Sequence, residues 1–265
     1  MPGLSSDAVL DLLREVAAEV ITPRFRSLAA GEVMEKNPGD LVTVADRESE
    51  AILTRELSAA YPDAFVLGEE RTAADHSAIE RYVAADHAFT VDPVDGTKNF
   101  VHGNPDHAVM VSEVTAGETV RAWIWQPEHE VGWVAERGAG VYRNGERITR
   151  KPVADDDEPR GATSMWTLRG HSFGHMPALV GSWVCCGVDY PKVIEGAIDY
   201  VLYGRNSPWD HSPGSLMVHE AGGWVGHPDG TAYHPRSRVA GIIVAADRGT
   251  YSHVRRQAAE ALAGR

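Results

Sequence analysis

Two aspartates that stand three positions apart near the middle of the chain could bind a hard cation. They are Asp92 and Asp95, in the string Val91-Asp92-Pro93-Val94-Asp95-Gly96-Thr97-Lys98-Asn99-Phe100. The proline biases the residue before it towards an extended backbone, and the glycine permits a sharp turn after the second acid. The free N–H groups of such a turn can hold an anion, and Mg2+ is commonly bound by carboxylates together with substrate phosphate. An Asp-Gly pair alone would indicate a solvated β-turn, but the whole string predicts a site for a cation and a phosphate.

Three further acids, distant in the sequence, have positions from which they could join this site. Glu69 follows the short apolar strand Phe65-Val66-Leu67, and Asp46 and Asp210 each stand where a helix is expected to begin. Asp46 by itself would be interpreted as a helix N-cap. Carboxylates that share a site repel each other, and burying them without cations costs several kcal/mol per charge. Since no run of histidines accompanies these acids, the set favours Mg2+ over Zn2+.

The elements that must position these acids alternate between helical and strand patterns. Apolar residues at helical spacing predict a first helix that is capped by Ser6 and ends near Pro23, and a second that begins at Asp46 and stops at Pro62. Asn144-Gly145 is a strong hairpin signal, whereas residues 165–177 have no clear period and are expected to form a loop. Further helices are expected at 75–85, 188–196, 215–221 and 252–263, and strands at 33–39 (with its turn), 41–44, 65–67, 89–91, 107–114, 120–125, 131–136, 198–203 and 242–245.

Length, composition and charge limit the class of protein. The chain of 265 residues fits one large domain or two small ones, and its hydrophobic content of 43% is that of an ordinary soluble globular protein. We expect a single domain over residues 1–265, with a seam near 154–160, where the cluster Asp155-Asp156-Asp157-Glu158 resembles a solvated linker. The net charge of −13 argues against a nucleic-acid partner, because nucleic-acid phosphates are bound by clustered Lys and Arg.

Cysteine usage and the chain ends predict a cytoplasmic protein. The only two cysteines, Cys185 and Cys186, are adjacent, and neighbouring cysteines rarely bridge each other. A reducing compartment is therefore expected. The first residues lack the basic flank and apolar core of a signal peptide, and the strongest apolar run, residues 239–246, is too short to span a bilayer. We therefore expect no membrane partner.

Four short motifs, taken together, resemble the signatures of the inositol monophosphatase family. The motifs occur in the family's order and span most of the chain. The resemblance implies an α/β (α+β) fold in which helices and sheets alternate as an α-β-α-β-α sandwich, and family members often form homodimers. The motifs are Asp40-Leu41-Val42-Thr43 with Asp46; Gly68-Glu69-Glu70; the central string with Gly103 and Pro105 after it; and Trp209-Asp210 through Glu220-Ala221-Gly222-Gly223.

The resemblance also implies two or three Mg2+ ions in the site. The first ion would be held by Glu69, Asp92 and the backbone carbonyl of Val94. The second would be held by Asp92, Asp95 and Asp210, and a third, weaker ion would lie beside Glu69. Paired ions of this kind lower the pKa of bound water and stabilise the attacking and leaving oxygens of an in-line displacement.

The same resemblance assigns roles around the phosphate. The N–H groups of Gly96 and Thr97 would bind phosphate oxygens. Thr97, hydrogen-bonded to Asp46, would orient the attacking water on the ion that Glu69 helps to hold. Phosphoryl transfer then needs positioning and charge neutralisation more than a covalent nucleophile. The residues expected around the phosphate are Asp95, Gly96, Thr97 and Asp210, and Glu70 and Lys36 are expected to lie behind the metal ligands.

The chain departs from the family pattern where the leaving alcohol is expected. Phe89 stands in place of the family's usual tryptophan, and Tyr203 in place of the glutamate that contacts ring hydroxyls in inositol-specific members. The run Val184-Cys185-Cys186-Gly187 replaces a run of smaller residues. These changes predict a phosphatase core with an altered substrate wall.

The predicted function is a magnesium-dependent phosphomonoesterase that hydrolyses a small polyol or sugar-like phosphate of the inositol-1-phosphate type. A histidinol-phosphate phosphatase, a fructose bisphosphatase and a broad-specificity sugar phosphatase are alternatives within the class. A non-catalytic relative that binds a phosphorylated ligand or a protein is the alternative from another class. The predicted partner is a small phosphate ester.

Overall fold

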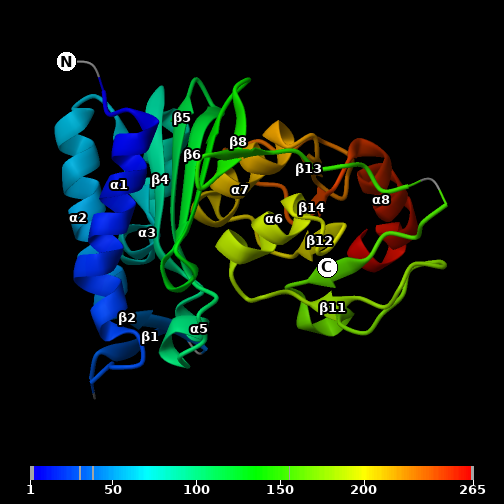
Figure 1. Cartoon of the computed structure of the whole chain (residues 1–265), viewed down its shortest axis with the longest axis horizontal. Helices are drawn as coiled ribbons and strands as arrows, with labels where there is room; N and C mark the ends of the chain where they lie inside the picture. Colours follow the sequence, from blue (N-terminus) through cyan, green and yellow to red (C-terminus); the bar gives the residue numbers. More distant parts are fainter. Residues whose placement is uncertain (1–2, 30, 38, 155, 264–265) are drawn as a thin grey trace.

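The computed structural model describes residues 3–29, 31–37, 39–154 and 156–263. Two β-sheets alternate with layers of helices along the long axis of the molecule (Figure 1). Helices α1 (Ser6–Val16) and α2 (Val44–Ala60) cover the outer face of the first sheet, and α8 (Arg248–Ala263) covers the far face of the second. Helices α6 (Cys186–Ile194) and α7 (Pro208–Glu220) lie between the two sheets. The expected α-β-α-β-α layering is confirmed.

The first sheet has seven strands in the spatial order β3-β4-β5-β6-β7-β8-β9, in which only β3 and β4 are parallel. The two-residue turn between β8 and β9 puts Asn144 (φ 47°) and Gly145 (φ 82°) in the left-handed region, so the predicted hairpin is confirmed. The strands are β3 (Phe65–Gly68), β4 (His87–Asp95), β5 (Ala108–Thr115), β6 (Glu118–Gln126), β7 (Val131–Glu136), β8 (Gly140–Arg143) and β9 (Glu146–Ile148).

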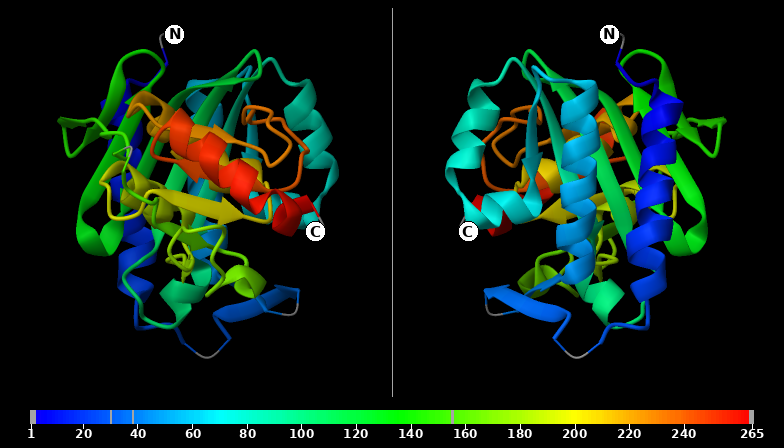
Figure 2. Two further views of the ribbon diagram at one scale, coloured as in Figure 1. Left: turned by 90° about the vertical axis from the view of Figure 1, so that its right-hand side faces the viewer. Right: turned by 90° about the vertical axis from the view of Figure 1, so that its left-hand side faces the viewer.

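The second sheet has five strands in the order β11-β10-β12-β14-β13. Strand β10 is parallel to β11 and β12, whereas β14 is antiparallel to β12 and β13. A separate antiparallel hairpin of β1 (Val33–Asn37) and β2 (Asp40–Thr43) projects at one end of the molecule in both views of Figure 2. The strands of the second sheet are β10 (Gly161–Thr163), β11 (Val180–Gly181), β12 (Tyr200–Tyr203), β13 (Trp224–Gly226) and β14 (Ile242–Ala245).

One apolar core joins the two sheets through the helices between them. Trp133 of the first sheet, Leu216 of α7 and Val244 of the second sheet belong to the same cluster of buried side chains. The residues between β9 and β10, where a seam was expected, carry the chain from one sheet to the other. Asp155, within that stretch, lies outside the described residues. The two sheets therefore share this cluster, and further buried clusters lie on their other faces.

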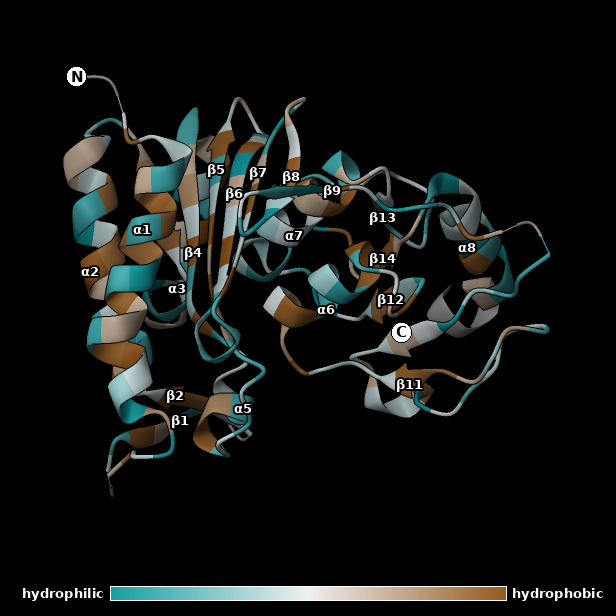
Figure 3. Cartoon of the chain, in the orientation of Figure 1, coloured by the Kyte–Doolittle hydropathy of each residue, from teal (hydrophilic) through white to brown (hydrophobic). Residues whose placement is uncertain are grey.

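The first helix buries one face and exposes the other. Val9, Leu13 and Val16 are buried, and Figure 3 shows hydrophobic and hydrophilic colours alternating along α1 and α2. The N-cap is Ser5, whose hydroxyl accepts the Ala8 N–H at 3.2 Å, and not Ser6 as predicted. After α1 the chain continues as a π turn and a 3-10 turn that end at residue 24, close to the predicted end.

Two helices begin earlier than the sequence predicted, and in both cases the acid predicted to join the site lies inside the first turn. Helix α2 begins at Val44 because Thr43, not Asp46, is its N-cap: Asp46 accepts the Thr43 N–H at 2.7 Å in a capping box. Helix α7 begins at Pro208 instead of residue 215, since proline suits the first helical position.

Shorter helices connect the larger elements. Helix α3 (Glu69–Ala74) was not predicted, whereas α4 (Ser77–Ala84) matches the helix expected at 75–85. Helix α5 (Thr97–Val101) begins within the central string, and residues 165–177 are irregular apart from one 3-10 turn at Trp166–Leu168, as expected. Among the helices described, none combines the length and apolar content needed to cross a bilayer.

Candidate active site

The parallel pairing of two strands brings Glu69 next to Asp92. In the register of β3 and β4, Gly68 lies opposite Val91. The residues that follow these positions, Glu69 and Asp92, therefore lie side by side at the same end of the strand pair, because parallel strands run in the same direction. Glu69 begins α3 at that end, and Asp92 stands one residue further along β4.

A bulge in β4 allows both central aspartates to serve one site. Asp92 lies opposite Met110 of β5, and Asp95 lies opposite Ala108. Strand β4 therefore has one more residue than β5 between these two positions. In a regular strand, residues three apart point to opposite faces. An extra residue bends the strand and redirects the side chains beside it, which the sequence indicated only through the proline between the acids.

Asp92 is the most enclosed acid of the site. It is 1% exposed, and its Oδ1 atom is buried with no hydrogen-bond partner among the described residues. Burial raises the pKa of the Asp92 carboxyl well above its ordinary value, and the charges of Glu69, Asp95 and Asp210 raise it further. The four acids that the sequence placed together therefore act on each other in the structure.

Asp95 is held by the start of α6, in the layer between the sheets. Its Oδ2 atom accepts the Gly187 N–H at 2.5 Å and lies 3.0 Å from the Cys185 Sγ atom. Burial raises the pKa of Asp95 to about 6, and the hydrogen bonds from Gly187 and Cys185 partly offset that rise. Two residues that the sequence marked only as departures from the family thus position a predicted metal ligand.

Asp210 lies in the first turn of α7. Burial raises the pKa of its carboxyl well above the ordinary value, as do Glu69 and Asp95, whereas hydrogen bonds with Ser207 and Asp92 lower it. A hydrogen bond between two carboxyl groups requires a proton on one of them, and a divalent cation would take that proton's place. The next residue, His211, is buried with its Nδ1 atom 3.0 Å from the Tyr190 hydroxyl, so it packs beneath the site.

The predicted pair of Thr97 and Asp46 is present. The Thr97 hydroxyl lies 3.0 Å from Asp46 Oδ1 and 3.0 Å from the carbonyl oxygen of Val94. Burial raises the pKa of Asp46 to about 7, the hydrogen bonds from Thr43 lower it, and the charge of Glu69 raises it. The Thr97 hydroxyl has one proton to donate and keeps lone pairs for a further donor, such as a water molecule.

Gly96 makes the turn that separates Asp95 from Thr97. Its φ of 80° lies in the left-handed region, and a Cβ atom there would lie 3.0 Å from the Asp106 carbonyl oxygen and 3.0 Å from the Cys185 Cβ. Glycine meets both constraints. The turn leads directly into α5, whose first residue is Thr97.

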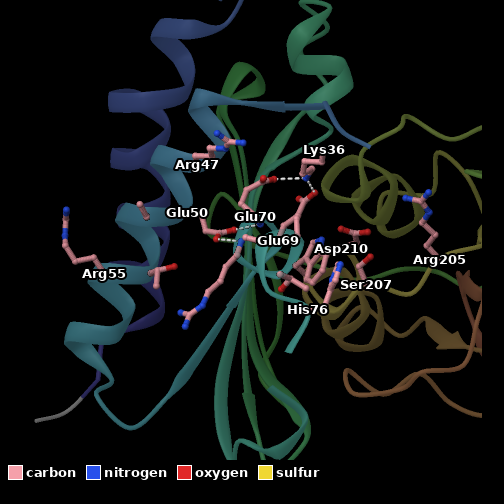
Figure 4. Close-up of a pocket in the computed structure, with 17 residues that line it drawn as sticks. Lys36, Arg47, Glu50, Arg55, Glu69, Glu70, His76, Arg205, Ser207 and Asp210 are labelled. Carbon is pink, nitrogen blue, oxygen red and sulfur yellow. Dashed lines mark hydrogen bonds and ion pairs between the residues drawn. The ribbon is translucent and has the colours of Figure 1, made fainter. Parts of the chain in front are cut away.

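Lys36 supplies a positive charge to the acids from the β1–β2 hairpin. Its Nζ atom lies 2.7 Å from an oxygen of Glu69 and 2.7 Å from an oxygen of Glu70 (Figure 4). Burial alone would lower the pKa of Lys36, but the carboxylates of Glu69 and Glu70 raise it above its ordinary value. Lys36 therefore links Glu69 to Glu70, and the place of Lys36 and Glu70 behind metal ligands stays a prediction.

Glu50 belongs to the site although the sequence analysis did not single it out. It lies one helical turn after Asp46 on α2, and its carboxylate accepts the N–H groups of Glu70 (2.7 Å) and Arg71 (2.8 Å) in the first turn of α3. Burial raises the pKa of Glu50 to about 7. A Cβ atom at Gly68 would lie 2.2 Å from the Glu50 carboxyl carbon, so only glycine fits there. The spacing of four residues from Asp46 was the signal available in the sequence.

The second sheet contributes a wall that faces the acids across a cavity of about 600 Å3. On this wall the Tyr203 hydroxyl donates to Asp189 Oδ2 at 3.1 Å, and Asp189 Oδ1 accepts the Trp183 N–H at 2.7 Å. Burial raises the pKa of Asp189 to about 7. Tyr203 was predicted to lie here, but Asp189, its partner, was not. The cavity is lined by Asp95, Gly96, Thr97, Cys186, Tyr203 and Asp210, among others.

The donor set fits a hard divalent cation. All the acids that act on Asp92 offer carboxylate oxygens, and the unpartnered Asp92 Oδ1 is a buried acceptor that a cation would satisfy. Among the described residues, no three His, Cys, Asp or Glu side chains are already arranged as a complete ligand set. The Glu69 carboxylate is instead hydrogen-bonded to Lys36, and the Asp95 carboxylate to the Gly187 N–H. The structure thus gathers the predicted ligands, and their roles as ligands stay a prediction.

Comparison with known proteins agrees with this geometry. The sequence pattern described as "Inositol monophosphatase family" matches residues 6–263. The chain is 30% identical over 240 residues to the inositol-1-monophosphatase of Mesorhizobium japonicum, covering 86% of this chain and 88% of that protein. It is 30% identical over 205 residues to the Nus factor SuhB of Vibrio cholerae, covering 73% and 74%. A solved inositol monophosphatase from Thermotoga maritima superimposes with a TM-score of 0.80 at 25% identity, covering 97% of each chain. The protein therefore belongs to the inositol monophosphatase family.

Proposed function

We propose that the protein is a magnesium-dependent phosphomonoesterase that acts on a small polyol or sugar-like phosphate. The observation that carries the proposal is Asp92, whose buried, unpartnered oxygen lies among three other acids. Glu69, Asp92 and the Val94 carbonyl would hold a first Mg2+, and Asp95 and Asp210 would complete a second site with Asp92. Bound there, the ions would neutralise the phosphate and lower the pKa of water towards neutrality.

The protein's own groups would position the reactants. Thr97, held by Asp46, would orient the attacking water through its hydroxyl, and the N–H groups of Gly96 and Thr97 would bind phosphate oxygens. Lys36 would hold Glu69 and Glu70 in place from the other side. Both cysteines are free, which suits the reducing, cytoplasmic setting that we infer for the protein.

A phosphate-release assay tests the proposal. The purified protein should release phosphate from at least one of inositol 1-phosphate, histidinol phosphate, glycerol 2-phosphate and fructose 1,6-bisphosphate in MgCl2, and release should stop in EDTA. The four substrates also separate the alternatives within the class. Release that persists in EDTA would contradict the proposed metal dependence.

A second candidate is a binding role without turnover. The Vibrio cholerae relative is named a Nus factor, which supports a role in which the family fold recognises another molecule. The retained Thr97–Asp46 pair disfavours this candidate, because a binding protein has no need to orient water. Absence of turnover on all four substrates, together with measurable Mg2+ binding by calorimetry, would favour it.

A further inference from the structure

Two exposed cationic side chains line the same cavity as some of the predicted site acids. Lys98 comes from α5 and Arg205 from the segment between β12 and α7, and both line the same cavity as Asp95, Thr97 and Asp210. Within the described residues, neither side chain makes a hydrogen bond or an ion pair, although carboxylates line the cavity with them. In Figure 4 no interaction joins Arg205 to the other residues drawn.

This contrasts with the cation on the acid side of the site. There Lys36 is bonded to two carboxylates at 2.7 Å each. Elsewhere in the chain, Arg150 bonds Asp199 at 2.7 Å and Arg24 bonds Glu48 at 2.9 Å. Exposed Lys and Arg side chains are commonly solvated, so the lack of a partner does not alone indicate a site.

What sets Arg205 apart is the backbone from which it extends. The buried ring of His211 is hydrogen-bonded to the Arg205 backbone, and His211 is fixed in turn by Tyr190. The next residue, Asn206, donates through its side chain to the carbonyl oxygens of Ser237 and Val239, both at 3.0 Å. The guanidinium is therefore carried by an anchored segment, which lowers the entropy that a ligand must overcome.

Lys98 is anchored in the same way. Before it, Thr97 is hydrogen-bonded to Asp46. After it, the Asn99 side chain donates to the carbonyl oxygens of Asp106 and Trp183, both at 2.7 Å. Lys98 and Arg205 thus extend from anchored backbone segments into one cavity, and neither has a side-chain partner within the described residues.

We propose that the substrate carries a second oxyanion, a phosphate or carboxylate on its leaving group, which Arg205 and Lys98 bind. This inference rests on the proposed phosphatase function and names the substrate class. The Mg2+ ions would occupy the acids, and the reacting phosphate would occupy the Gly96–Thr97 turn. The leaving group would then lie in the rest of the cavity, beside Arg205 and Lys98. A neutral polyol would leave both cations without a partner, whereas an oxyanion forms charge-assisted hydrogen bonds with them, bidentate to arginine.

Matched substrates and matched variants test the inference. The phosphate pair is fructose 1,6-bisphosphate and fructose 1-phosphate, and the carboxylate pair is 2-phosphoglycerate and glycerol 2-phosphate. In at least one pair the wild type should prefer the member that carries the second oxyanion. We expect Arg205→Gln and Lys98→Gln each to reduce the preference, as a ratio of kcat/KM values, by about tenfold, because a charge-assisted hydrogen bond is lost. Arg205→Lys should restore part of it.

Arg256→Gln is the control, because it removes one exposed positive charge on α8, away from the cavity. It should leave the preference unchanged. A preference that survives in the double variant Arg205→Gln/Lys98→Gln, or that falls equally in the control, would overturn the inference. So would wild-type turnover with no preference in either pair.

A binding measurement separates this inference from the proposed function. Calorimetry with fructose 1,6-bisphosphate and with 2-phosphoglycerate in MgCl2 should show binding that weakens about tenfold in Arg205→Gln. If the wild type releases no phosphate but this dependence is present, the phosphatase proposal fails and the oxyanion site stands. If turnover is present and binding is indifferent to Arg205 and Lys98, the oxyanion site fails alone.

Discussion

The two sheets build opposite sides of the site in different ways. On the first-sheet side, acids are buried and interlocked, as in the capping box of Thr43 and Asp46 and the Glu50 carboxylate that holds α3. On the second-sheet side, Tyr203 is hydrogen-bonded to the buried Asp189, whereas the Arg205 side chain has no hydrogen-bond or ion-pair partner within the described residues. Acids that are held by several hydrogen bonds suit chemistry that tolerates little movement. A cation that is not already paired can bind a charged group of the ligand and so discriminate between substrates. We expect substitutions on the first side to affect turnover and substitutions on the second to affect preference.

The largest effect is expected from Asp92→Asn. Loss of the shared metal charge should reduce phosphate release by at least about 10²–10³-fold, because preorganised charge carries most of the stabilisation in such sites. The fold should survive, and the melting temperature in EDTA should rise, since a buried charge among like charges has been removed. Asp63→Asn, at an exposed position, should change neither quantity. Near-wild-type turnover in Asp92→Asn would refute the metal assignment.

Thr97→Val should have the next largest effect. It removes the hydroxyl that lies 3.0 Å from Asp46, and kcat should fall by about 10²-fold because the water is no longer oriented. The inhibition constant for inorganic phosphate should change less than about twofold, because backbone N–H groups remain. Thr97→Ser keeps the hydroxyl and should retain most of the turnover. Equal losses in turnover and phosphate binding would argue against the orienting role.

Stability against acid should depend on Mg2+. Burial lowers the pKa of His107 to about 4 and of His211 to about 3, so the unfolded chain takes up these protons near pH 6.5 and the folded protein does not. Their contribution to stability is therefore lost as pH falls below about 6.5, by about 2 kcal/mol for each histidine at pH 5.

Buried acids of the first side oppose this loss when Mg2+ is removed. Burial raises the pKa of Asp46 and Glu50 to about 7, so the folded protein gains stability as these groups take up protons between pH 7 and about pH 4. Bound cations keep the neighbouring acids ionised and suppress that gain. The melting temperature should thus fall more steeply from pH 7 to pH 5 in MgCl2 than in EDTA. Parallel profiles would show that the acids are not coupled to a cation.

The smallest effect is expected from Tyr203→Phe, on the second side. Loss of one hydrogen bond to Asp189 should lower the free energy of unfolding by about 1 kcal/mol and change kcat/KM by less than about tenfold. Tyr142→Phe, which removes a longer contact at 3.3 Å in the first sheet, is the matched control. A loss of turnover as large as that of Thr97→Val would remove the distinction between the two sides.

Motifs with a local physical meaning were predictable from the sequence. The strand end at Glu69, the turn at Gly96 and the hairpin at Asn144-Gly145 each follow from the conformations that a few neighbouring residues favour. The layered order of the fold came from the family resemblance. Helix starts were less predictable: α7 begins at Pro208, seven residues before the predicted position, and proline suits the first position of a helix.

Residues whose role depends on distant packing were missed. Glu50 reaches Glu70 across 20 positions, and Asp189 meets Tyr203 only because α6 packs against β12. Asp189 belongs to no local motif, and the four-residue spacing from Asp46 to Glu50 is too common on helices to select Glu50 among the chain's many acids. The same holds for Arg205, because only the three-dimensional structure shows which side chains lie near its guanidinium.

The ammonium of Lys36 would affect how strongly a divalent ion binds beside Glu69. The Lys36 ammonium lies 2.7 Å from Glu69 and 2.7 Å from Glu70, and these carboxylates raise the pKa of Lys36 above its ordinary value. A divalent ion bound at Glu69, as we propose, would therefore compete with the Lys36 ammonium for this carboxylate. The net affinity of the position would be the attraction of Glu69 for the ion less its attraction for Lys36. We therefore expect the ion to bind weakly there and to exchange readily.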